Sequence, residues 1–412
     1  RPSLSQGALP KLWISEATGD NRTRIAVLVP ALLLSGTPSW RLRQLRIEVP
    51  VRPLLLPAVR RLWRDATTLQ LGSDPGRAIV LANLAPGTAG VLALMDGCHT
   101  LGEITALASA HGVGPPQLGE LLSLLSRAGV LVEAEPAAGL PSRFPEAARR
   151  RLRPDIGALS LGHGAEAGEV LARRSRACTE VWAAGRAGPV VAALLAAAGV
   201  GRVHVRGTGT VAADDAAPGG LLPADEHRPY ATAAAEAIHR AAPETDTRPP
   251  GPRRPPALVV LADHRAQLRP ASLPGYARAA ALLPVHLRDG AAIVGPLVVP
   301  DGGPCLNCTD LHRTDRDPAW PALAAQLRTA ARGRSEPSQI ALVVAAAGLA
   351  ATQALAYLDG GTPEALGRSL ELTGLGEPIR RRSWTRHPRC GCHRRYAGRP
   401  AVAGVPREKH HG

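Results

Sequence analysis

Aromatic residues are scarce in this chain of 412 residues, at 3%. Proteins that bind single-stranded nucleic acids stack the bases on aromatic side chains, so this scarcity argues against that class. The formal net charge is nevertheless +15, from 49 Lys and Arg against 34 Asp and Glu. Most of the excess is Arg in a chain rich in Ala, Gly and Pro, and no basic face interleaved with aromatics is present. We therefore interpret the charge as a compositional bias and expect no nucleic-acid partner.

Long hydrophobic runs are also few. Residues 25–34 (IAVLVPALLL) are apolar but too short for a membrane span, which needs about 20 residues, and they lack the position and cleavage site of a signal peptide. The longer run at 341–358 contains Gly348 and Gln353 between ordinary loops. This pattern favours a core or dimer-interface helix over a membrane span. We expect a cytoplasmic protein without membrane contact.

The first half of the chain divides by pattern. Residues 1–50 are poorly patterned, and because dense apolar patterning begins at Val51, we expect translation to start there. Residues 51–135 form the first predicted domain. Within it, Thr68–Gly72 and 77–84 read as short strands joined by turn residues at 73–76 (SDPG).

Three predicted helices follow these strands, at 86–95, at 100–110 and from 115 to about 129. The second opens with a capping box, Thr100 and Glu103, and the third starts at two prolines and has leucines on one face. Two strands and three short helices predict a small α+β winged-helix domain. A DNA-binding regulator is the weakest alternative, because the third helix has only Arg127 as a base reader. The segment resembles PqqD-like peptide-recognition domains, which implies that a leader peptide adds a strand to the sheet.

Residues 136–175 are rich in Pro, Ala and Arg and are predicted to be a linker. Residues 176–393 form the second predicted domain, which begins with a strand at 179–183, a turn at 185–188, a helix at 189–198 and a strand at 202–205. Such a βαβ unit binds nucleotides when GxGxxG lets phosphates approach the helix N-terminus and an acid after the second strand binds ribose. Here the sequence of the turn is AxGxxG, in which Gly185 and Gly188 match the second and third glycines of the motif.

The junction LLAAAGVGRV (Leu194–Val203) resembles that of the ThiF/MoeB adenylyltransferase family, which implies a Rossmann-like α/β fold and an ATP site with Mg²⁺. In that family Val-Asp-x-Asp-x-Val follows, but here both acids are glycine within 206–211 (RGTGTV). Asp214 and Asp215 lie close enough to substitute. Asp263, after the strand at 257–261, stands near the place of the family's metal-binding Asp, although a strand-end Asp also caps turns. We expect a degenerate nucleotide site.

Cysteines are few but paired. Cys305 and Cys308 form a CxxC, and Cys390 and Cys392 form a CxC. In a cytosolic protein such pairs predict a zinc site rather than disulfides, and four thiolates close the tetrahedral shell, so the zinc is structural. His312, His387 and His393 are nearby alternatives that we expect to lie outside the shell.

The other two cysteines, Cys98 and Cys178, are interpreted as lone buried thiols. No cysteine lies between 308 and 390, which excludes thioester transfer from that segment.

The runs GPLVVP, CLNCTDLHR and HPRCGCH, within a match from about Val51 to His393, resemble the ThiF-like proteins of azole-peptide (TOMM) pathways, the cyclodehydratase-partner or leader-peptide-binding group of actinobacteria. The resemblance implies a homodimer that binds a ribosomal precursor peptide and presents it to a separate ATP-using YcaO enzyme. The alternative is an active adenylyltransferase that activates a carboxyl group. Residues 394–412 are expected to be a disordered tail.

Overall fold

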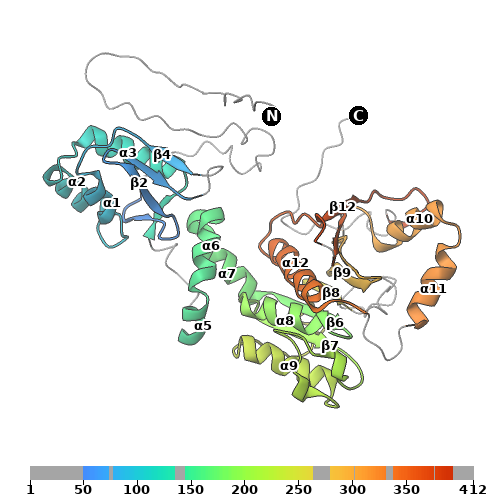
Figure 1. Cartoon of the computed structure of the whole chain (residues 1–412). Coiled ribbons are helices and arrows are strands. Elements are labelled where there is room, and N and C mark those ends of the chain that lie inside the picture. Colours follow the sequence, from blue (N-terminus) through green and yellow to red (C-terminus); the bar gives the residue numbers. More distant parts are fainter. Residues whose placement is uncertain are drawn as a thin grey trace, which may run out of the picture. The chain divides into compact units, whose positions relative to one another are not determined.

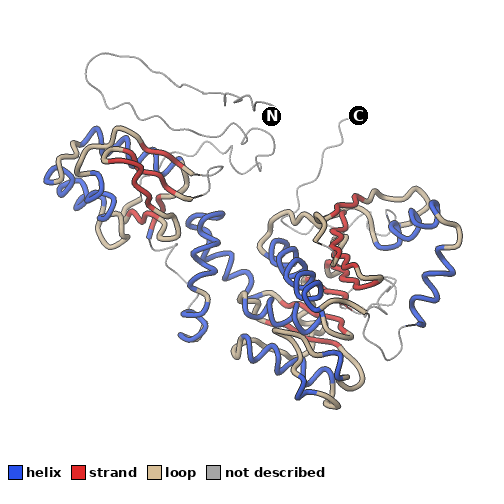
Figure 2. Tube along the Cα trace, viewed as in Figure 1, coloured by secondary structure: helices blue, strands red, loops and turns tan. Residues whose placement is uncertain are grey.

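The computed structural model describes residues 50–73, 78–134, 144–262, 279–300, 302–330, 337–374 and 376–392. The expected leader and tail, Asp263 and His393 therefore lie outside the described residues. The chain divides into two compact units. The first comprises residues 1–142 and 153–169, and the second comprises 143–152 and 170–412. Figure 1 labels their elements and Figure 2 distinguishes helices from strands.

Among its described residues, the first unit contains two small antiparallel sheets. The three-stranded sheet has the order β2-β3-β4 and consists of β2 (Arg61–Asp65), β3 (Thr68–Leu71) and β4 (Ile79–Leu81). The other sheet pairs β1 (Pro53–Leu55) with β5 (Leu131–Glu133). The expected strands at 68–72 and 77–84 are confirmed as β3 and β4. The sequence pattern missed β2, because all five of its residues are exposed and show no alternation of burial.

Three helices cover these sheets: α1 (Thr88–Leu94), α2 (Leu101–Ala110) and α3 (Pro115–Arg127). The predicted capping box is present, since Thr100 Oγ1 accepts from the amide of Glu103 and the Glu103 carboxylate accepts from the amide of Thr100. The buried face of α3 consists of four of its five leucines, namely Leu118, Leu121, Leu122 and Leu125. These leucines join the buried residues of β3 and β4 in one hydrophobic cluster, so the unit has its own core.

The segment predicted as a linker is helical over most of its length. It contains α5 (Glu146–Arg151), α6 (Arg153–His163), the 3₁₀ turn η3 (Gly164–Glu166) and α7 (Ala167–Arg176). Its composition hid a helical stripe, because in α7 the buried residues Ala167, Val170, Leu171 and Arg174 recur at spacings of three and four. In α7 the buried Arg174 makes a bidentate ion pair with Asp359, at 2.6 and 2.7 Å. Burial of these residues overrides the Pro/Arg-rich composition.

A seven-stranded mixed sheet forms the centre of the second unit, in the order β12-β11-β10-β9-β8-β6-β7. Its strands are β6 (Cys178–Ala183), β7 (Arg202–Arg206), β8 (Leu258–Ala262), β9 (Ala281–Arg288), β10 (Ala291–Val294), β11 (Arg368–Thr373) and β12 (Arg380–Ser383). The first four of these are parallel to one another, and the pairs from β9 to β12 are antiparallel. The expected βαβ unit is confirmed as β6, α8 (Ala187–Ala197) and β7.

Helices lie on both faces of this sheet (Figure 1). One face is covered by α8, α9 (Tyr230–Ala241) and α12 (Ile340–Leu358), and the other by α10 (Leu306–Arg316) with α11 (Trp320–Ala330) after it. Two 3₁₀ turns, η4 (Ala213–Asp215) and η5 (Pro223–Asp225), separate β7 from α9. Because β8 alternates its side chains between two buried faces, its sequence is continuously apolar.

Helix α12 is long and apolar enough to cross a membrane, with a mean hydropathy of 1.8, and 44% of that stretch is buried within the protein. Its alanines pack in the same cluster as α8 and the strands β9 and β11. Gln353 is buried and its side-chain oxygen accepts from the amide of Ala365 at 2.8 Å. These contacts agree with the expected core helix.

Candidate functional site

The glycine turn after β6 holds α8 against the sheet. Gly185 has φ +73°, a conformation that side chains disfavour. A Cβ at Gly188 would lie 2.2 Å from Cβ of Ala183, so α8 approaches β6 as closely as glycine permits. Both glycines are therefore explained by backbone geometry and close packing, whether or not a phosphate binds.

The end of β7 carries a feature that the sequence did not reveal. A Cβ built on Gly207, which stands at the first acid position of the expected motif, would lie 2.3 Å from Cδ1 of Tyr230. The Tyr230 hydroxyl donates to the carbonyl of Gly185 at 2.6 Å, and its amide donates to the carbonyl of Gly209 at 3.0 Å. Tyr230 is 2% exposed. One tyrosine thus bridges the glycine turn and the strand end where a ribose would be bound.

The two substitute acids differ in burial and in their contacts. The Asp215 carboxylate accepts from the amide of Ala212 at 2.9 Å and caps η4, and the residue is buried. Asp214 is exposed, and its main-chain carbonyl accepts from Nε of Arg186 at 2.5 Å. Arg186 also donates to the carbonyl of Ser338 at 3.3 Å. Within the described residues, Asp215 is committed to a turn, and Arg186 links the glycine turn to two neighbouring segments.

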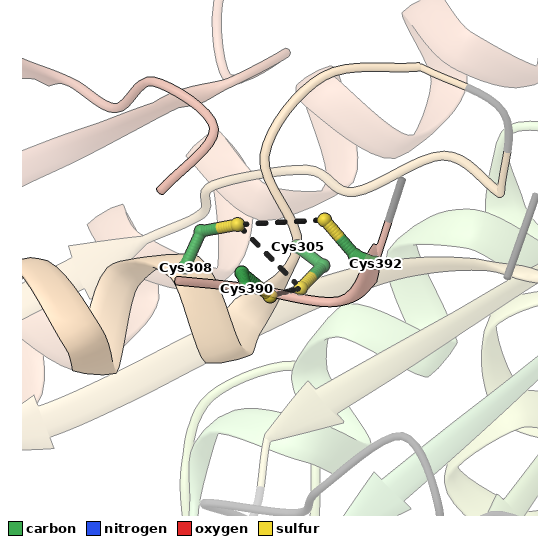
Figure 3. Close-up of side chains that lie close together, drawn as sticks. All are labelled: Cys305, Cys308, Cys390 and Cys392. Carbon is green, nitrogen blue, oxygen red and sulfur yellow. Dashed lines mark hydrogen bonds between the residues drawn. The ribbon is translucent and has the colours of Figure 1, made fainter. Parts of the chain in front are cut away.

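The four paired cysteines meet in a buried cluster (Figure 3). Cys305 precedes α10 and Cys308 lies in its first turn, while the other two cysteines follow β12 near the end of the described chain. All four sulfur atoms lie within 4.8 Å of one another, and each residue is at most 9% exposed. Apolar side chains of β8 and β9 surround them. The cluster joins segments 84 and 85 positions apart in sequence.

The arrangement of the four sulfur atoms fits tetrahedral coordination of one metal ion. Four metal–sulfur bonds of about 2.3 Å require sulfur atoms about 3.8 Å apart. The Sγ distances are 3.8 Å for Cys305–Cys308, 3.6 Å for Cys305–Cys390 and 3.6 Å for Cys308–Cys392. The cluster could therefore hold a metal ion with four protein ligands, which leaves no coordination position for a substrate.

Burial makes the cysteine cluster unsuited to uncompensated thiolates. It raises the pKa of Cys305 above its usual value and that of Cys392 to about 11. Burial acts in the same direction on Cys390, but donors outweigh it there, chiefly Nδ2 of Asn307 at 3.3 Å from the sulfur, and its pKa falls to about 7. Because an apolar site disfavours buried charge, four thiolates here require a bound cation.

No protein-family model and no curated protein sequence matches the chain. Solved structures match its fold. Escherichia coli MccB with AMPCPP and MccA gives a TM-score of 0.63 at 12% identity, covering 83% of this chain and 99% of that one. The microcin C7 biosynthetic enzyme MccB with N-formylated MccA gives 0.58 at 13%, again covering 83% and 99%. PaaA gives 0.60 at 15%, covering 80% and 99%.

The chain has the fold of these proteins. MccB is ThiF/MoeB-like, so the α/β fold that the sequence resemblance implied is confirmed at the level of fold. At these identities, the likeness establishes the fold alone.

The neighbouring histidines do not point to further ligands. His387 is buried, with its Nε2 2.7 Å from Oδ2 of Asp315 and its Nδ1 accepting from the amide of Arg389 at 3.1 Å. Nε2 of His312 is 3.0 Å from the carbonyl of Thr385. Both rings therefore connect α10 to the segment that carries the second cysteine pair, as expected for residues outside a metal shell.

The two remaining cysteines differ. Cys178 is buried at the start of β6, as expected, and burial raises its pKa to about 11. Cys98 is exposed, so the prediction of a buried thiol was wrong there. It follows Asp96 and Gly97 in a turn whose amides bond to the Asp96 carboxylate, and this turn chemistry places residue 98 at the surface.

Proposed function

We propose that this protein binds a ribosomally made precursor peptide and presents it to a separate modifying enzyme, without using ATP itself. MccB, whose fold the chain shares, has been solved in complex with MccA, which supports a peptide as the partner. The resemblance to azole-pathway proteins supports a YcaO-type modifying enzyme, a cytoplasmic location and a homodimer.

The bridging position of Tyr230 carries the scaffold proposal. A ribose-binding carboxylate is missing at Gly207, and the tyrosine ring occupies the space next to that position. The hydrogen bond to Gly185 fixes the ring over the glycine turn. To admit a nucleotide, the protein would have to move a buried ring and leave the Gly185 carbonyl without this donor, which costs about 1–3 kcal/mol before any contact is gained.

A repair experiment tests this proposal. We compare the wild type with Tyr230→Ala and with the double variant Gly207→Asp/Tyr230→Ala, using photolabelling by 8-azido-ATP with Mg²⁺ and mass mapping of the labelled peptide. We expect labelling near 185–209 in the double variant alone, because only it has both space and a carboxylate. Labelling of the wild type near 185–209 that unlabelled ATP prevents would contradict the proposal. Circular dichroism checks that each variant is folded.

We propose that residues 51–135 are a winged-helix peptide-recognition domain in which the peptide adds a strand beside β2. This strand is at the edge of its sheet, and its Leu62 and Trp63 are 40% and 45% exposed. An exposed edge offers main-chain hydrogen bonds, and neighbouring apolar side chains provide contacts for alternate residues of the peptide.

Peptides selected from a display library on the full chain would test this recognition surface. We expect Trp63→Glu to weaken binding of a fluorescein-labelled selected peptide by at least tenfold. Leu107→Glu is the matched control, since Leu107 is 42% exposed on α2 of the same unit. Equal effects of the two substitutions would rule out a β2-specific interaction.

We further propose that the ion held by the cysteine cluster is structural Zn²⁺. Four thiolates in tetrahedral geometry are typical of such sites, and the buried, fully protein-ligated arrangement assigns the metal to fold stability.

An active adenylyltransferase remains the second candidate function. One observation favours it, namely that a matching MccB structure contains AMPCPP. In that case Asp263, which lies outside the described residues, would hold Mg²⁺. Saturable binding of MgATP that is lost on Asp263→Ala would support this alternative.

A further inference from the structure

A cavity of about 220 Å³ lies beside the antiparallel half of the central sheet, apart from both sites above. Three arginines from separate elements line it: Arg288 at the end of β9, Arg313 on α10 and Arg382 on β12. Ile293 and Trp384 provide apolar wall, and Trp384 is 7% exposed. This volume is below the roughly 300–1,000 Å³ of drug-sized ligand pockets, so it suits a group no larger than an amino-acid side chain.

Strand register gathers these residues on one face. Ile293 of β10 stands opposite His286 on β9 and Glu371 on β11. Arg288 stands opposite Ala291, next but one to Ile293 along β10, and since side chains alternate, it shares that face. Helix α10, which is fixed at its start by the cysteine cluster, brings Arg313 over the same region.

Two of the three arginines form ion pairs with carboxylates of the protein. Nε of Arg382 is 3.1 Å from Oε1 of Glu371, and Nη1 of Arg313 is 3.2 Å from Oδ1 of Asp310. Asp289 also lines the cavity and, like Arg382, is exposed to solvent; in the part of the chain that the structure describes, it makes no ion pair with an arginine. Among the described residues, no carboxylate lies within ion-pair distance of Arg288.

Aromatic rings hold the guanidinium groups of Arg313 and Arg382 in place. Cζ of Arg313 lies 5.0 Å from the ring centre of Trp320 and 5.3 Å from that of Trp384. Cζ of Arg382 lies 5.9 Å from the Trp384 ring centre. Planar guanidinium groups held in this way lose little freedom when they bind a carboxylate through two parallel hydrogen bonds.

Neighbouring pKa values respond to the same positive charge. Burial lowers the pKa of Arg313, and Arg288 and Arg382 lower it further against the opposing effect of Asp310. Burial lowers the pKa of His286 to about 4, and Arg288 and Arg313 act in the same direction. The positive charges of Arg288 and Arg313 therefore reach the His286 ring, which stands opposite Ile293.

We propose that this cavity binds a carboxylate, namely the acidic side chain of the bound peptide, between Arg288, Arg313 and Arg382. The peptide origin of the carboxylate rests on the proposed function, whereas the anion site itself stands on the cavity and its arginines. An acidic residue of the client would thus be held beside the sheet of the second unit, and the cavity would select clients that carry one.

The test uses the full, zinc-loaded chain with ¹⁵N-labelled arginine and follows the Nε–Hε signals by NMR. The probes are glutamate blocked at both ends, glutamine blocked in the same way, and inorganic phosphate. We expect saturable shifts of the signals of the three lining arginines with blocked glutamate and none with blocked glutamine. Phosphate that binds at least tenfold more tightly than blocked glutamate would overturn the carboxylate assignment, and no saturable shift with any probe would overturn the site.

Two variants fix the location. Arg288→Gln should weaken the binding of blocked glutamate at least tenfold, whereas Arg381→Gln should change this affinity less than twofold. Arg381 is the matched control because it lies on β12 beside Arg382, and so points to the other face, where it contacts Glu364. Equal effects of both variants would contradict the site. These probes contain no leader sequence, so failure here leaves the peptide-binding proposal standing, and failure of peptide binding at Trp63 leaves the anion site standing.

Discussion

Replacing Cys308 by serine removes a ligand from the centre of the cysteine cluster. Cys308 is completely buried, and its sulfur is 3.8 Å from that of Cys305 and 3.6 Å from that of Cys392. A metal bound to the four sulfurs joins α10 to the segment after β12. We expect Cys308→Ser to lose the metal and to release this segment from α10.

The loop that the metal closes sets the magnitude. The linked cysteines lie 84 and 85 positions apart. For a disulfide closing a loop of this length, the chain-entropy relation gives about 4–5 kcal/mol. If a metal link constrains the chain to the same extent, its loss should raise hydrogen exchange in the tethered segment about a thousandfold, since 1.4 kcal/mol corresponds to a factor of ten.

Two measurements check this expectation. Elemental analysis should find one zinc per wild-type chain and almost none in Cys308→Ser. Hydrogen-exchange mass spectrometry should find faster exchange at 306–316 and 384–392 in the variant, and in the wild type after chelation. Cys98→Ser is the control, because Cys98 is an exposed thiol in the other unit. Full zinc content in Cys308→Ser, or exchange at 384–392 that changes less than threefold, would refute the reasoning.

Four further substitutions, one of them a rescue, probe the second unit. Asp359→Ala leaves the buried Arg174 without its bidentate partner and should destabilise the unit by about 3–5 kcal/mol in urea unfolding; a loss below 1 kcal/mol would show that the pair contributes little. Gly188→Ala places a Cβ 2.2 Å from that of Ala183 and should cost about 1–3 kcal/mol, which Ala183→Gly should recover in thermal melts. Because burial raises the pKa of Cys178 to about 11, its folded form holds the proton more tightly, and stability should fall as pH rises from about 9 to 11. Cys178→Ala should remove that part of the pH dependence, and identical profiles would contradict the assignment.

Much of the fold followed from periodicity and turn chemistry. The βαβ unit, the apolar strand β8 and the capped helix α2 were predicted within a few residues, because local propensity and burial agree there. Strand β2 was missed because a sheet edge imposes no alternation on an exposed strand. The helices at 146–176 were missed because the Pro/Arg-rich composition concealed the buried stripe of α7, whose residues recur at spacings of three and four.

The candidate sites were predictable to different degrees. The metal cluster could be predicted from the cysteine spacings, because CxxC and CxC each keep two thiols close enough to bind the same ion. Tyr230 was not foreseen, because its ring meets Gly207 only through the fold between β7 and α9. The arginine cavity draws on several strands and one helix, and the register of its strands is a tertiary property. No local sequence pattern predicts such a site.

The central claim is that this fold binds a peptide and does not bind ATP, with the buried Tyr230 bridging the glycine turn and the end of β7. The most direct test is isothermal titration calorimetry of the full, zinc-loaded wild type with ATP and Mg²⁺, with Asp263→Ala alongside. We predict no saturable binding up to millimolar ATP for either protein. Saturable binding to the wild type that is lost in Asp263→Ala would contradict the account and identify the protein as an active nucleotide-binding enzyme.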